Sequence, residues 1–145
     1  MSTTDSLSLA WAAGFADGEG CISLAKQTFR TGRRATYAMR FDVFQNNREV
    51  LLHFEAAVDV PGRLYATKRT TAANRQLYHL TYSGQKAYEV IGRLHPFLRR
   101  KGPEAAIALE YRQLCRVGWH PGPGGFPEAL WQLRERYYKK LKRLK

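Results

Sequence analysis

The stretch 12–20, Ala-Ala-Gly-Phe-Ala-Asp-Gly-Glu-Gly, decides how this sequence is interpreted. A helix is predicted over 7–16, and it is expected to stop there because the run from Asp17 to Gly20 is too rich in glycine to continue it. Two carboxylates, those of Asp17 and Glu19, therefore stand where the helix ends. Acidic residues are scarce in this chain, so a pair of acids at a helix end is poorly explained as solubilising charge.

Small residues line one face of the same helix. Ala10, Ala13, Gly14 and Asp17 follow the i, i+3, i+4, i+7 spacing, which places them on a single side. Small side chains let two helix backbones approach closely, so we expect this face to form a dimer interface. A twofold pairing would bring two copies of Glu19 together, and two acids over a phosphodiester can hold Mg²⁺ ions that activate water.

The hydrophobic pattern outside this stretch alternates between strand and helix periods. Strands are predicted over 21–27, 36–43, 64–69 and 75–82, and helices over 47–58, 83–98, 103–116 and 127–144, with Asn47 and Ser83 as caps and Pro127 at the first helical position. This order indicates an α+β fold with one antiparallel sheet. Helices would cover one face, and the polar face would be open to solvent or to the major groove of DNA.

Composition points in the same direction. The 145 residues, 44% of them hydrophobic, suit one domain over 1–145. Lys and Arg number 24 against 12 Asp and Glu, which favours nucleic acid first and an anionic membrane surface second. Cys21 and Cys115 form no disulfide framework, and no signal peptide or membrane span is apparent. We expect an intracellular protein without a membrane partner, and bacterial or phage cytoplasm and an organelle both stay open.

Three segments resemble the LAGLIDADG homing endonuclease family. The stretch 12–20 resembles the family's motif, 41–45 (Phe-Asp-Val-Phe-Gln) resembles the end of its second strand, and 94–101 (Leu-His-Pro-Phe-Leu-Arg-Arg-Lys) resembles its LxPFLxxK segment. The resemblance implies an αββαββα core over about 7–116 with a curved antiparallel four-stranded sheet, followed by C-terminal helices that include a basic helix at about 127–145. A single motif implies a homodimer.

The resemblance also implies roles for the acids at the helix end. Glu19 and Gly18 would hold the catalytic metal, Mg²⁺, whose place Mn²⁺ or Ca²⁺ can take, and Asp17 would cap the paired helix. The last acid is Glu where the motif has Asp, and Glu still supplies an oxygen ligand. Without the family match, the same string would be an ordinary helix stop followed by a turn.

Three further residues are carried over by position as catalytic. Gln45 would position the attacking water, and Lys101 would stabilise charge or help proton transfer. Arg48 or Glu49 would occupy the position of another active-site residue, and Arg48 is preferred. The simpler alternatives are that Gln45 ends a strand and that Lys101 is a solvated lysine near a helix boundary.

Outward side chains of the two hairpins are the candidate DNA contacts. Arg40 and Arg69 are the strongest of them, because the alternation along each strand places them on the outward face and their positive charge suits DNA. The hairpin-turn arginines could contact outer bases or phosphates. The full set is Ser23, Ala25, Gln27, Arg30, Arg33, Arg34, Thr36, Ala38, Arg40, Asp42, Tyr65, Thr67, Lys68, Arg69, Arg75 and His79.

Together these features predict a site-specific, metal-dependent endonuclease. As a homodimer it would make a double-strand break in a long, near-palindromic double-stranded DNA target. The alternatives are a cleavage-inactive relative that acts as an intron RNA maturase, a transcription regulator with the same fold, and a purely electrostatic RNA-binding protein. Glu19, Gln45 and Lys101 occur together, which the last of these would not require.

Overall fold

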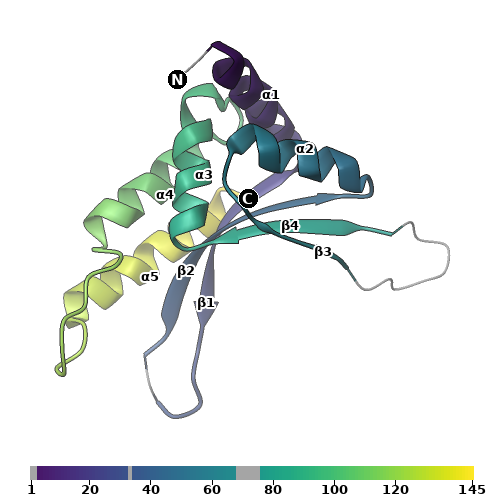
Figure 1. Ribbon diagram of the computed structural model, residues 1–145. Helices are drawn as coiled ribbons and strands as arrows, with labels where there is room; N and C mark the ends of the chain where they lie inside the picture. Colours follow the sequence, from purple (N-terminus) through teal and green to yellow (C-terminus); the bar gives the residue numbers. More distant parts are fainter. Residues whose placement is uncertain (1–2, 33, 68–75) are drawn as a thin grey trace.

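An antiparallel sheet and a layer of helices make up the protein, so the predicted α+β class is confirmed (Figure 1). The structure is a computed structural model, and it describes residues 3–32, 34–67 and 76–145. Its elements are α1 (Thr3–Glu19), β1 (Gly20–Gln27), β2 (Thr36–Gln45), α2 (Arg48–Val58), β3 (Arg63–Ala66), β4 (Tyr78–Ser83), α3 (Gln85–Leu94), the 3₁₀ helix η1 (His95–Phe97), α4 (Gly102–Leu114) and α5 (Glu128–Arg143).

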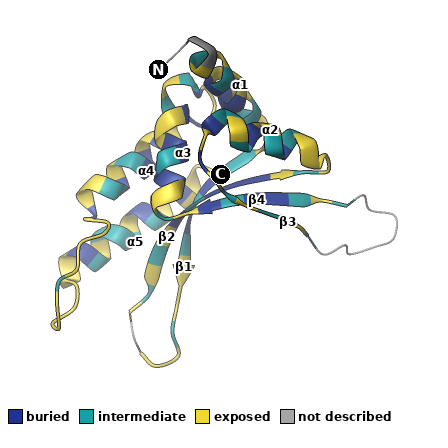
Figure 2. Ribbon diagram, viewed as in Figure 1, coloured by how far each residue is buried: buried dark blue, intermediate teal, exposed yellow. Residues whose placement is uncertain are grey.

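The four strands are antiparallel and lie in the order β1-β2-β4-β3. Ile22 on β1, Phe41 on β2 and Tyr82 on β4 lie directly opposite one another and are buried. Helices α1, α2 and α3 contact this face of the sheet, and Figure 2 shows buried residues, in dark blue, on the strands near these helices. The predicted alternation along the strands is therefore confirmed: apolar side chains face the helices and mostly polar ones face away.

Helix α1 is longer than predicted at both ends. It begins at Thr3 and includes Asp17, Gly18 and Glu19, so the expectation that this glycine-rich run would end the helix was wrong. Glycine costs about 1 kcal/mol relative to alanine inside a helix. The Asp17 carboxylate offsets that cost, because it accepts backbone hydrogen bonds from Arg99 and Lys101, both at 2.9 Å.

Gly20 marks the junction at which α1 becomes β1. A Cβ atom there would lie 2.8 Å from the carbonyl oxygen of Ala16 and 3.2 Å from Cζ of Phe41. No ordinary side chain fits so close to backbone, so the chain can leave the helix and enter the sheet at this point only through glycine. The junction fixes the end of α1 directly over the sheet.

Two of the predicted helix starts and one helix end need correction. Asn47 caps α2 as predicted, accepting from the Val50 amide at 3.3 Å. Ser83 is instead the last residue of β4, and Gly84 occupies the cap position with φ 59°. Pro127 lies at the N-cap of α5 instead of its first helical position. Helix α3 ends at Leu94 and gives way to η1, where a proline ring would clash with a continuing α-helix.

Helix α5 packs along the edge strand β1. Leu130, Tyr137 and Leu141 are buried beneath it, as its predicted apolar side requires, whereas Leu144 is exposed. Glu135 on α5 accepts a hydrogen bond from Lys26 Nζ at 2.9 Å and another from the Tyr37 hydroxyl, which ties the helix to the first hairpin. Across the described ranges, no helix is both long and apolar enough to cross a membrane.

Candidate active site and nucleic-acid interface

The last turn of α1 is held by the segment that precedes α4. Besides the two backbone bonds to the Asp17 carboxylate, Lys101 Nζ donates to the Asp17 carbonyl oxygen at 3.2 Å. Burial alone would raise the pKa of Asp17, but the backbone amides of Lys101, Arg99 and Arg100 outweigh it and lower that pKa. The Lys101 side chain is thereby buried against the end of α1, where its ammonium bonds the residue two positions before Glu19. The simpler alternative, that Lys101 is a solvated lysine near a helix boundary, was wrong.

Glu19 is the last residue of α1 and is exposed, as is Gly18 before it. Nothing in the described part of the chain forms a hydrogen bond or an ion pair with the Glu19 carboxylate. The described residues also contain no group of three or more His, Cys, Asp or Glu side chains able to hold a metal ion. One chain therefore offers a single unpaired carboxylate at this position, together with the carbonyl oxygens that a helix leaves free at its C-terminal end.

Gln45 and Arg48 lie where β2 passes into α2. Gly20 pairs with Val43, so the end of β2 runs past the junction between α1 and β1, and Gln45 lies two residues beyond that pair. Its Oε1 atom accepts from the Asn46 amide at 2.9 Å. Arg48 is exposed at the first position of α2. Neither residue forms a hydrogen bond or an ion pair with Glu19 within the described ranges.

The outer face of the sheet carries the predicted DNA-contacting side chains in rows across the strands. Ser23 lies opposite Arg40, Ala25 opposite Ala38, and Gln27 opposite Thr36. Tyr65 and Thr67 continue this face toward the second hairpin, where the Thr67 hydroxyl donates to the Leu77 carbonyl at 3.0 Å. All of these side chains are exposed or half-buried. Lys68, Arg69 and Arg75 lie outside the described residues.

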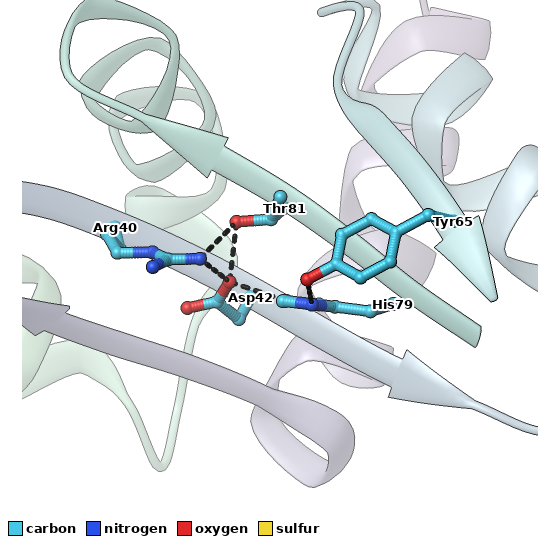
Figure 3. Close-up of polar contacts among 5 residues, drawn as sticks. All are labelled: Arg40, Asp42, Tyr65, His79 and Thr81. Carbon is cyan, nitrogen blue, oxygen red and sulfur yellow. Dashed lines mark hydrogen bonds and ion pairs between the residues drawn. The ribbon is translucent and has the colours of Figure 1, made fainter. Parts of the chain in front are cut away.

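Asp42 and His79 are corrections to the predicted set of open contacts. Both lie on the outer face, but Asp42 is only 9% exposed and His79 only 5%. His79 Nε2 lies 2.6 Å from Asp42 Oδ1, and the Tyr65 hydroxyl contacts Nδ1 (Figure 3). The His79 ring also stacks on Phe44, with ring centroids 4.1 Å apart. Neighbouring side chains cover both residues, so neither is open to contact bases.

One arginine near the turn of the first hairpin contacts helix α5 of the same chain. Arg34 forms an ion pair with Glu128 at the start of α5, and its guanidinium lies over the Trp131 ring, 5.2 Å from the centroid. Arg30 is exposed and remains available to a partner. Arg33 falls outside the described residues. The prediction of a hairpin turn is confirmed, and the contact of Arg34 with outer bases or phosphates stays a prediction.

The small-residue face of α1 differs from the predicted one. Ala13 is completely buried within its own chain, so it cannot contact a partner, and Asp17 is occupied by the segment before α4. Ala10 and Gly14 are exposed, as predicted for an interface. The same side also includes three residues that were not predicted to belong to it: Leu7, Trp11 and Gly18. Helical spacings of 4, 7 and 11 residues, counted from Leu7, lead to Trp11, Gly14 and Gly18 and would have identified this side.

Comparison with solved structures identifies the architecture. The homing endonuclease I-CvuI, in complex with its target in the presence of calcium, is similar over 97% of this chain and 83% of its own, with a TM-score of 0.75 and 20% identity. The archaeal intron-encoded homing endonuclease I-Vdi141I, complexed with DNA, covers 97% and 86% with a TM-score of 0.76 and 17% identity. The LAGLIDADG homing endonuclease I-LtrWI, bound to target DNA, covers 90% of this chain and 42% of its own, with a TM-score of 0.62 and 16% identity.

No protein-family model matches the sequence, and no curated protein matches it. The similarity to solved structures therefore identifies the fold. It covers the motif at the end of α1, the four-stranded sheet and the helices that pack on it. This chain has the fold of the LAGLIDADG homing endonucleases.

Proposed function

We propose that this chain is a site-specific DNA endonuclease that works as a homodimer with a divalent metal ion. The observation that carries the proposal is the unpaired, exposed carboxylate of Glu19 at the end of α1, with the buried Lys101 bonded to the carbonyl oxygen of Asp17 in the same last turn. A net charge of +12 and a broad polar sheet face supply the affinity for DNA. The similar structures of I-CvuI and I-Vdi141I are themselves complexes with a target or DNA.

The donor atoms at the end of α1 fit Mg²⁺. Carboxylate and carbonyl oxygens are hard ligands of the kind that Mg²⁺ prefers, and Glu19 and Gly18 would supply them. Each chain contributes one such carboxylate, so two chains contribute two. A divalent ion bound there would lower the pKa of water and stabilise the charge that develops on the phosphate.

The chain's own residues would do the remaining work. Gln45, at the end of β2, has an amide that can orient an attacking water by donating and accepting hydrogen bonds. Lys101 is fixed by its bond to Asp17, so its ammonium needs little reorganisation to stabilise negative charge. Arg48 at the start of α2 would contribute a further positive charge. The acid at position 19 distinguishes this function from that of a regulator or maturase.

Two glycines on α1 support the dimer. A Cβ atom at Gly14 or Gly18 would meet nothing within 4 Å in this chain, in contrast to Gly20, which is tightly enclosed. Each therefore costs helix stability without any gain inside the subunit. Large apolar side chains flank them on the same side, where Leu7 is 70% exposed and Trp11 40% exposed. A second helix in close contact accounts for both features.

The target would then be long and near-palindromic, because a twofold dimer presents the same sheet face to each half. The overhangs would be short and 3′, by resemblance to the family.

The direct test is cleavage selection from a library of randomised DNA duplexes with Mg²⁺, comparing the wild type with Glu19→Gln. We expect the wild type to enrich one cut sequence with near-twofold symmetry, and we expect Glu19→Gln to bind that sequence without cutting it. Equal cutting by both proteins would refute the role of Glu19. Specific binding without cutting by the wild type would favour a regulator or a maturase instead.

The dimer is tested by sedimentation of Gly14→Leu beside Gly92→Leu. Gly92 is the matched control, because it is also an exposed helical glycine whose Cβ position is open, but it lies on α3. We expect the wild type and Gly92→Leu to sediment as dimers, and Gly14→Leu as a folded monomer that has lost cleavage. A wild-type monomer that cuts both strands would overturn the proposed arrangement.

A further inference from the structure

Arg40 occupies the centre of the outer sheet face. It lies on β2, an inner strand of the order β1-β2-β4-β3, opposite Ser23 on one side and Ser83 on the other. Its side chain is 37% exposed. The edges and hairpin turns of such a sheet are the parts that would approach phosphates, whereas the centre would face the base edges in the groove.

Two side chains of the sheet hold the Arg40 guanidinium in place. Its Nη2 atom donates to Thr81 Oγ1 at 3.1 Å and to Asp42 Oδ1 at 3.3 Å (Figure 3). Asp42 is the anchor of the group, because the same Oδ1 atom also accepts from Thr81 Oγ1 at 2.6 Å. A guanidinium with two fixed contacts loses less rotamer freedom when it binds a ligand.

Asp42 is itself fixed from the opposite side. His79 Nε2 lies 2.6 Å from Asp42 Oδ1, and the Tyr65 hydroxyl contacts the other ring nitrogen of His79. If Tyr65 donates to Nδ1, the neutral ring has its proton on Nε2 and donates it to Asp42. Figure 3 shows these residues as one chain of contacts that ends at Arg40. These contacts explain why the carboxylate of Asp42 is buried on a face that is otherwise suited to bind an anion.

The anchored guanidinium still lacks acceptors for part of its surface. Nε is buried and has no partner, and Nη1 makes no hydrogen bond within the described ranges. A positive group that is this well held, yet incompletely bonded, is suited to a ligand with acceptor atoms. In the major groove, guanine presents two acceptors, O6 and N7, whereas adenine replaces the first with a donor.

We propose that Arg40 reads a guanine in the major groove, once in each half of the target, and that Asp42 is the positioning residue that sets its orientation. This inference rests on the proposed function, because it assumes that the outer face lies on duplex DNA. It adds the base that is recognised and the role of a buried acid. Thr81 and His79 act on recognition only through Asp42 and Arg40.

The test is a binding selection from randomised duplexes in Ca²⁺, which separates recognition from cutting. We expect wild-type protein to select guanine at one symmetric pair of positions, and Arg40→Ala to lose that preference while keeping its preferences elsewhere. Loss of one such contact corresponds to about 1 to 3 kcal/mol, or roughly 5-fold to 150-fold weaker binding per half-site. Arg112→Ala removes the same charge from the helix layer and should leave the selected sequence unchanged.

Asp42→Asn tests the positioning role, because it keeps the side-chain shape and removes the charge. We expect the preference for guanine over adenine at that position to fall, with unchanged affinity for unrelated duplex. Arg40→Lys, which keeps the charge but not the planar group that Asp42 and Thr81 hold, is expected to weaken the same preference. Near-ultraviolet circular dichroism checks that each variant keeps its tertiary packing.

Four outcomes separate this inference from the proposed function on which it rests. Uniform weakening by Arg40→Ala on every sequence would show a phosphate contact and overturn the inference. An unchanged guanine preference in Asp42→Asn would overturn the role of Asp42. If wild-type protein selects no sequence at all, the proposed function fails as well; if it selects a sequence whose preferences do not depend on Arg40, only the present inference fails.

Discussion

Phe41 and Asp42 are neighbours on β2, yet they are buried by opposite means. Phe41 points to the helices, is completely inaccessible, and stacks on Phe54 with ring centroids 5.9 Å apart. Asp42 points away from the helices and is buried by hydrogen-bond donors, those of Thr81 and His79 among them. One face of the sheet is closed by packing, and part of the other is closed by polar contacts.

The difference separates stability from recognition. On the inner face, the free energy of unfolding depends on how much side-chain volume fills the core, because a close-packed interior does not collapse fully around a missing side chain. On the outer face, the same free energy depends on hydrogen bonds between side chains close to water, and water partly replaces a hydrogen bond that is lost. Substitutions on the inner face should therefore change folding most, and substitutions on the outer face should mainly change binding.

The largest effect is expected from Phe41→Ala. Removing a ring from the centre of the core should lower the free energy of unfolding by about 3 to 5 kcal/mol. Denaturant unfolding measures this change, and Phe44→Ala, which removes a ring from the outer face of the same strand, is the matched control with a smaller expected cost. A similar loss from both variants would contradict the distinction between the two faces.

A smaller loss is expected from Asp42→Ala. The change leaves the donors of Thr81, His79 and Arg40 without their common acceptor, which should cost about 1 to 3 kcal/mol of unfolding free energy. Combining it with His79→Ala completes a double-mutant cycle, and we expect the two changes to be clearly non-additive. Strict additivity would mean that the 2.6 Å contact between the two side chains contributes no coupling.

Lowering the pH should weaken the hydrogen bonds of Asp17 and of Glu135, which lie near the two ends of β1, and the loss of stability should be smaller than in Asp42→Ala. Backbone hydrogen bonds lower the pKa of Asp17 despite its burial, and hydrogen bonds from Lys26 and Tyr37 likewise lower the pKa of Glu135 despite burial. A depressed carboxyl pKa stabilises the fold above the unfolded value, near pH 4, and that contribution disappears as the pH falls through the folded value.

Unfolding free energies measured between about pH 6 and about pH 3 test this expectation. Stability should decline below about pH 4 to 5, and the decline should be shallower in Asp17→Asn and in Glu135→Gln than in the wild type. Glu49→Gln, which removes an exposed carboxylate from the first turn of α2, is the control and should follow the wild-type curve. Parallel curves for all four proteins would refute the assignment.

The smallest effect on stability, and the clearest contrast in chemistry, is expected from the two cysteines. Cys115 is completely buried in the helix layer, and burial raises its thiol pKa to about 11. Cys21 is half-buried on β1, opposite Asp42. At pH 8 a thiol reagent should modify Cys21 in the native protein and should reach Cys115 only on unfolding, as mass spectrometry of the labelled peptides would show.

Much of the fold could be predicted from local pattern. The alternation along β1 and β2 and the helical spacing after Asn47 are short-range features, and both were correct because a strand or an amphipathic helix must bury its own apolar side. The motif at 12–20 led to the fold that the structural likeness supports. The ends of elements were less accurate, as the extension of α1 to Glu19 and the end of α3 at Leu94 show.

The sequence by itself determined which side chains alternate along the strands, that two acids lie near the end of the first helix, and that the chain carries a net charge of +12. Only the tertiary structure decided which of them remain available. Lys101 reaches the end of α1 across 84 positions, and His79 reaches Asp42 across 37. Contacts at such separations depend on how elements pack, so no local pattern shows that Asp42 and Ala13 are covered while Glu19 and Gly14 remain open.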